Sequence, residues 1–140
     1  MIDKFNTILL DMNQTFMFDS DRFSPNEDYS IIYRQLGGVM EPTGVNQLIG
    51  GAYDYLDIRY PDPVYRESFP SLREAFENVM LLESVLAEDV ELLVETFAHH
   101  ELGTVPTEYA AAINQLSEQF RLGLVIDIWS PKILWVETLE

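Results

Sequence analysis

The chain has 140 residues, of which 47% are hydrophobic, and a formal net charge of −16 from 24 acidic and 8 basic residues. This length suits one ordinary domain, and the apolar content is sufficient for a hydrophobic core. The negative charge argues against nucleic-acid binding, because it repels phosphate backbones. It also repels a phosphorylated ligand unless a metal ion neutralises the site.

The composition also limits location and chemistry. The chain contains no cysteine, which excludes disulfides and thiolate zinc sites and favours the cytoplasm. No apolar run approaches the roughly 18 residues that a membrane span requires. Asp3 and Lys4 precede a run that is too short for a secretory leader. We therefore expect a cytoplasmic protein without a membrane span.

Residues 5–19 are the stretch around which the chain is organised. Residues 8–10 form a short apolar run, typical of a strand buried on both faces of a parallel sheet. Asp11 ends the run, and open α/β sheets bind ligands at the carboxyl ends of their strands. Turn formers follow, from Asn13 to Thr15. The pattern predicts either a metal-binding or nucleophilic carboxylate, or a strand that ends in an Asx-turn without chemistry.

The middle of the chain has a helical pattern and no strand pattern. Residues 19–27 are polar and contain Pro25, which is the composition of a linker. Ser71 and Glu74 have the spacing of a capping box. Apolar residues at helical spacing then predict four helices, over about residues 28–36, 45–60, 71–80 and 87–100.

The last third of the chain predicts a helix, a strand and a final helix. Pro106 suits the first turn of a helix, and apolar residues line one side of it as far as Phe120. Residues 121–127 form a second apolar strand that ends in a carboxylate. A right-handed crossover would make the two strands parallel neighbours. The final helix is expected to carry Trp129 and Trp135, which both need burial.

Residues 9–16, LLDMNQTF, resemble motif I of the haloacid dehalogenase-like hydrolase superfamily, a hydrophobic strand followed by Asp-Xaa-Asp-Xaa-Thr. Asp11 matches the first Asp and Thr15 the Thr, whereas Asn13 replaces the second Asp and Gln14 replaces the common Gly. The resemblance implies that Asp11 attacks phosphorus and binds Mg2+, that Asn13 offers its backbone carbonyl to the metal, and that Thr15 holds the loop. Asn13 cannot shuttle a proton, because an amide does not titrate near neutral pH.

Residues 105–127, VPTEYAAAINQLSEQFRLGLVID, resemble the helix and strand that lead into motif II of the same superfamily. That strand ends in a Ser or Thr that contacts the phosphoryl group. Ile126 occupies this position and cannot donate a hydrogen bond, and Asp127 follows as a substrate-binding candidate. Ser130 substitutes only if the loop folds back, and a surface or helix-start role is the alternative. Lys132 is too early in the chain for the motif III lysine of the superfamily.

Together these stretches predict an α/β fold with two parts. Residues 1–19 and 103–140 are expected to form a partial Rossmann-like core of parallel strands, and residues 20–102 an all-helical cap. This order resembles the helical-cap branch of the superfamily, but motif III and the acidic pair of motif IV are absent. A two-stranded parallel sheet leaves its edges and faces uncovered. Either the chain is a fragment of a longer protein, or a homodimer covers the incomplete core.

The resemblance implies a phosphatase-type hydrolase that acts on a small phosphorylated metabolite through Asp11 and Mg2+. The altered and missing motifs predict little activity. A noncatalytic interaction or assembly domain is the alternative that Asn13 and Ile126 favour. A further alternative is a 2-haloacid dehalogenase, which uses the same attacking Asp without Mg2+.

The sequence offers further candidate residues outside the two motifs. Arg22 and Arg34 flank the linker and are candidates for binding an anionic substrate. Asp19 and Asp21 either approach the metal or are solvated. His99 and His100 point to different faces of a helix, so we expect an interaction with the helix dipole and no shared metal. The tyrosines of the middle region either line a pocket or form its core; they are Tyr29, Tyr33, Tyr53, Tyr55, Tyr60 and Tyr65.

Overall fold

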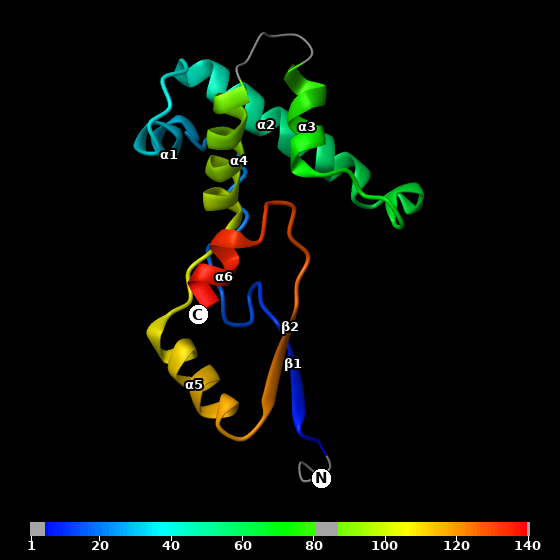
Figure 1. Ribbon diagram of the computed structural model, residues 1–140, viewed down its shortest axis with the longest axis vertical. Helices are drawn as coiled ribbons and strands as arrows, with labels where there is room; N and C mark the ends of the chain where they lie inside the picture. Colours follow the sequence, from blue (N-terminus) through cyan, green and yellow to red (C-terminus); the bar gives the residue numbers. More distant parts are fainter. Residues whose placement is uncertain (1–4, 81–86, 140) are drawn as a thin grey trace.

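The computed structural model describes residues 5–80 and 87–139. In this part of the chain it is a mixed structure with one two-stranded sheet and six α-helices, arranged as Figure 1 shows. The elements are β1 (Thr7–Asp11), α1 (Ser30–Gln35), α2 (Pro42–Arg59), the short 3-10 helix η2 (Pro63–Tyr65), α3 (Leu72–Met80), α4 (Ala87–Glu101), α5 (Thr107–Ser117), β2 (Arg121–Val125) and α6 (Ile133–Leu139).

The two predicted strands pair in parallel, as expected. Thr7 of β1 is opposite Arg121 of β2, and the register continues to the pair Asp11 and Val125. Helix α5 precedes β2 and contacts it. In Figure 1 the strands lie at one end of the molecule and α1, α2 and α3 at the other, with α4 running between them. Asp11 is therefore at the end of β1 that points toward the helices.

The prediction that β1 is buried on both faces is wrong. Exposed and half-buried residues alternate along the strand, and the side chain of Leu9 is 68% exposed. Leu10 instead packs against a buried cluster formed by Met12, Phe16, Met17 and Trp135. Because the described sheet has two strands, one of its faces packs and the other remains exposed.

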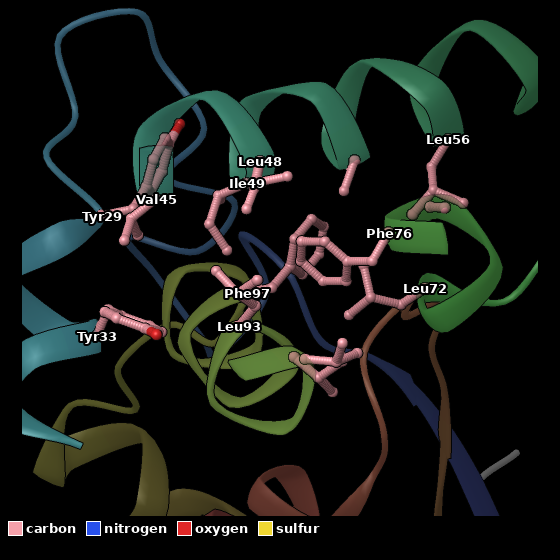
Figure 2. Close-up of a cluster of buried hydrophobic side chains, with 14 residues drawn as sticks. Tyr29, Tyr33, Val45, Leu48, Ile49, Leu56, Leu72, Phe76, Leu93 and Phe97 are labelled. Atoms are coloured by element: carbon pink, nitrogen blue, oxygen red, sulfur yellow. The ribbon is translucent and has the colours of Figure 1, made fainter. Parts of the chain in front are cut away.

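Helices α1, α2, α3 and α4 share one hydrophobic core. The buried residues of α2 recur at helical spacing and face α3 and α4, as Figure 2 shows. A Cβ atom on Gly51 would lie 3.0 Å from the side chain of Val79, so the glycine permits close approach of α2 and α3. Helix α2 begins at Pro42, three residues earlier than predicted, because proline suits the first turn.

The predicted capping box at the start of α3 is confirmed. The backbone N–H of Ser71 donates to the carboxylate of Glu74 at 2.7 Å, and the N–H of Glu74 donates to the hydroxyl of Ser71 at 3.2 Å. The prediction for the final helix is wrong in one respect, since Trp129 lies before α6 and packs against the helical core. Pro131 explains this, because proline disfavours helical geometry in the residue before it.

None of the helices in the described ranges, 5–80 and 87–139, has the length and apolarity that crossing a membrane requires.

Candidate functional site

The loop after β1 holds Asp11 in a defined position. Three backbone N–H groups, those of Thr15, Phe16 and Met17, each donate to the carbonyl of Met12 at 3.1 Å. The Thr15 hydroxyl reaches back to the Asp11 carboxylate at 3.4 Å. Gln14 has a φ of 61°, a left-handed conformation in which glycine is the least strained residue. The tight turn therefore brings the Thr15 hydroxyl back to the Asp11 carboxylate at the end of β1.

Asn13 has one satisfied and one unsatisfied side-chain group. Its Nδ2 donates to the carboxylate of Asp21 at 3.4 Å. Its Oδ1 is buried and accepts no hydrogen bond within the described structure. A buried polar atom without a partner costs about 1–3 kcal/mol, and a bound cation or hydrogen-bond donor removes that cost. Asn13 thus provides an acceptor that suits a ligand.

A cavity of about 360 Å³ lies beside this loop. Asp11 and Asn13 line it on one side, and the segment after β2 contributes Ile126, Asp127 and Trp129. The helical segment contributes Tyr53, Asp57 and Tyr60, and residues near the linker contribute Asp21 and Glu101. The structure thus brings Asp11, Asn13 and Asp127 together around one cavity.

Sequence spacing explains the helical side of the cavity. Tyr53, Asp57 and Tyr60 follow one another at intervals of four and three residues, which places them on one side of a helix. Tyr60 directly follows α2, and its hydroxyl donates to Asp127 at 2.7 Å. This bond and the negative charge of Asp127 raise the pKa of Tyr60 above its usual value. The contact joins the helical segment to the end of β2.

Glu101 fixes the loop that follows β2. Glu101 is 4% exposed. Its carboxylate accepts hydrogen bonds from the backbone N–H groups of Trp129 at 2.6 Å and Ser130 at 3.0 Å, and also from the Ser130 hydroxyl. The Ser130 oxygen in turn accepts the indole N–H of Trp135 at 3.0 Å. Burial raises the pKa of Glu101, although these hydrogen bonds oppose the shift.

This network corrects one prediction and adds one residue that the sequence analysis did not name. A surface role for Ser130 is wrong, because the residue is buried and its hydroxyl bonds to Glu101. Sequence reasoning also missed Glu101. Its only signal is a carboxylate in the last turn of α4, where helix-dipole considerations favour a cation.

The two candidate arginines lie outside the cavity lining. Arg22 donates to the backbone oxygens of Asp19 at 3.0 Å and His99 at 2.6 Å, so it ties the linker to the end of α4. Arg34 is an exposed residue in the last turn of α1. Among the residues that the structure describes, the cavity lining includes neither arginine nor lysine.

The histidines and tyrosines separate into different roles. His100 is buried, and the centroid of its ring lies 4.9 Å from that of Tyr29. Its Nδ1 lies 2.9 Å from the carbonyl oxygen of Thr96. Burial lowers the pKa of His100, so it behaves as a core residue. Tyr29 and Tyr33 are buried in the helical core, whereas Tyr53 and Tyr60 line the cavity. Tyr29 and Tyr33 are therefore core residues, and Tyr53 and Tyr60 are pocket-lining residues.

The residues around Asp11 are compatible with Mg2+ as a partial site. Within residues 5–80 and 87–139, His, Cys, Asp and Glu side chains form no group of three or more that is placed to hold a metal ion. Mg2+ is often bound by one or two carboxylates, with waters and substrate phosphate completing its shell. Asp11 supplies one such carboxylate, and the unpartnered side-chain oxygen of Asn13 is a further candidate ligand beside the backbone carbonyl that the resemblance implies.

Comparison of the chain with protein-family models, with curated proteins and with solved structures finds no match.

Proposed function

We propose that this chain is a haloacid dehalogenase-like hydrolase of the phosphatase type, with residues 1–19 and 103–140 as a partial core and 20–102 as a helical cap. One observation supports it above the others. Asp11 ends a parallel strand and, with Asn13, opens onto a cavity that the helical segment also lines. In α/β proteins, ligands bind at the carboxyl ends of the strands.

The proposed reaction uses the carboxylate of Asp11 as the nucleophile. A carboxylate oxygen attacks the phosphorus of a phosphate monoester, and the bond between phosphorus and the leaving oxygen breaks. The leaving alkoxide takes a proton from water. Water then hydrolyses the acyl phosphate, which releases phosphate and restores Asp11. The Thr15 hydroxyl, 3.4 Å from the carboxylate, orients the nucleophile.

Asp11 and Asn13 would hold Mg2+ in this reaction. The ion, when bound, neutralises phosphoryl charge in a cavity that is otherwise acidic. Asn13 supplies no proton to the leaving group, and Ile126 donates no hydrogen bond to the phosphoryl oxygens. General acid–base catalysis contributes roughly 100- to 10,000-fold, so we expect turnover to be slower than that of a complete enzyme by a factor in this range.

The proposal is tested by trapping a phosphoryl mimic on Asp11. Beryllium fluoride with excess Mg2+ is added to the wild type, to Asp11→Asn and to Asp19→Asn, and protein-bound fluoride is followed by 19F NMR. We expect a bound signal in the wild type and in Asp19→Asn, which removes the same charge from an exposed loop position outside the cavity lining. Absence of a bound signal in the wild type, or an equal signal in Asp11→Asn, refutes the proposal.

A noncatalytic interaction or assembly domain is the second candidate function. The supporting observation is that Ile126, which the resemblance aligns with the phosphoryl-binding Ser or Thr of motif II, lines a cavity that five carboxylate-bearing residues also line. This candidate predicts that no fluoride signal is trapped at residue 11 in the presence of millimolar Mg2+. A trapped fluoride signal that depends on Asp11 contradicts it.

A further inference from the structure

The cavity beside Asp11 combines negative charge with aromatic surface. Five of its lining residues carry carboxylates, namely Asp11, Asp21, Asp57, Glu101 and Asp127. Three more, Tyr53, Tyr60 and Trp129, carry aromatic rings. Such a lining repels an anion and attracts a cation, both through the carboxylates and through the negative faces of the rings.

The three rings come from two separate segments and meet at Trp129. The centroids of Tyr53 and Trp129 are 5.5 Å apart with their planes inclined by 50°, and those of Tyr60 and Trp129 are 5.8 Å apart and inclined by 61°. Inclined rings present faces in several directions, which suits contact with a rounded organic cation. The bond between Tyr60 and Asp127 holds one ring in place.

Three further observations are consistent with a cation at this position. Burial raises the pKa of Tyr53, and the charges of Asp57 and Asp21 add to the effect, as expected in a negative field. The buried Oδ1 of Asn13 accepts no hydrogen bond within the described structure. A cavity of about 360 Å³ is in the size range of small-molecule sites.

We infer that this cavity binds an organic ammonium ion against the rings of Tyr60 and Trp129, with the carboxylate of Asp57 as a charged partner. Binding itself requires neither Mg2+ nor turnover. Its consequence for the substrate does rest on the proposed function: the preferred substrate is a phosphate monoester whose alcohol carries an ammonium group. The ammonium charge then offsets part of the repulsion between the phosphate and the acidic cavity.

Choline and its neutral isostere 3,3-dimethyl-1-butanol provide the test, with metal and phosphate both omitted. The chain has two tryptophans. Trp135 is 1% exposed and outside the cavity lining, so a change in tryptophan fluorescence on ligand binding reports on Trp129. We expect a saturable fluorescence change with choline and little change with the alcohol. Calorimetry should give the same dissociation constant for choline. In Trp129→Phe the fluorescence response should vanish while calorimetry still detects binding.

Two charge-matched variants locate the binding site. Asp57→Asn removes a carboxylate that lines the cavity, whereas Asp54→Asn makes the same change elsewhere on α2. We expect Asp57→Asn to weaken choline binding at least about threefold. Asp54→Asn should change it by less than about twofold, because Asp54 is outside the cavity lining and its exposed charge, which acts on Tyr53 more weakly than that of Asp57, is screened. Circular dichroism confirms that both variants fold.

Several results overturn the inference. These are equal responses to choline and the alcohol, no saturable response to either, a fluorescence response that persists in Trp129→Phe, or equal effects of Asp57→Asn and Asp54→Asn. The outcome is separable from that of the proposed function. If beryllium fluoride fails to bind but choline binds, the hydrolase proposal and its consequence for the substrate are refuted while the ammonium site stands, and in the reverse case the ammonium inference alone is refuted.

Discussion

Replacing Glu101 with Gln tests whether its carboxylate holds the loop after β2. Both carboxylate oxygens accept hydrogen bonds, one from the N–H of Trp129 and the other from the N–H and hydroxyl of Ser130. Glutamine has one acceptor oxygen, so its NH2 group must face a donor on one side. One or two buried donors therefore lose their partner. A hydrogen bond to a charged group contributes about 1.5–3 kcal/mol and an unsatisfied buried group costs about 1–3 kcal/mol.

We therefore expect Glu101→Gln to lower the free energy of unfolding by about 2–4 kcal/mol. At roughly 3 °C per kcal/mol for a domain of this size, the Tm should fall by about 6–12 °C. Urea unfolding at neutral pH, followed by circular dichroism, measures the change. The control is Glu118→Gln, which removes the same charge at an exposed position after α5 and should have little effect. A loss below about 0.5 kcal/mol in Glu101→Gln would refute the network's structural role.

Three further predictions concern packing, pH and the contact between the helices and the strand ends. Gly50→Ala should stabilise α2 by about 0.5–1 kcal/mol, since its Cβ meets nothing within 4 Å. Gly51→Ala should gain less or lose stability, because its Cβ would lie 3.0 Å from a valine of α3. Equal urea unfolding midpoints for Gly50→Ala and Gly51→Ala would contradict this. Burial lowers the pKa of His100 below its ordinary value of 6.5. Between the folded-state pKa and about pH 6.5 the unfolded state therefore binds more protons than the folded state, so stability falls as the pH falls from about 6.5 to the folded-state pKa and levels off below it. His100→Gln should lose this dependence and His99→Gln should keep it, as unfolding midpoints between pH 5 and pH 8 would show. Tyr60→Phe should cost about 0.5–1.5 kcal/mol by removal of its hydrogen bond, and an unchanged urea midpoint would count against that bond.

The elements of this fold were largely predictable from local pattern. The apolar runs that end at Asp11 and Asp127 predicted the strands, and their parallel pairing followed from the helix between them. The capping box of Ser71 and Glu74 was also predictable, because the two residues lie within one helical turn of each other. Periodicity and local hydrogen bonding act over a few residues, so local sequence carries these features.

Features that depend on distant neighbours were not predictable in the same way. The exposure of Leu9 follows from the number of strands in the described sheet, which the apolar run does not reveal. The contact between Glu101 and Ser130 joins residues 29 positions apart, and neither has a local motif. The cavity itself was anticipated through Asp11, Asn13, Asp127, Asp21 and the tyrosines of the middle region that face it. Contacts between the end of α2 and the segment after β2 added Asp57 to the cavity lining and placed Trp129 beside Tyr53 and Tyr60.

The most direct test of the central claim is chemical detection of phosphoryl transfer to Asp11. The protein is incubated with acetyl phosphate and Mg2+ and then reduced with borohydride, which converts an aspartyl phosphate to homoserine, and the peptides are analysed by mass spectrometry. The proposed function predicts homoserine at position 11, none at Asp19, and none when Mg2+ is chelated. Unmodified aspartate at position 11 under conditions in which the protein remains folded would contradict it.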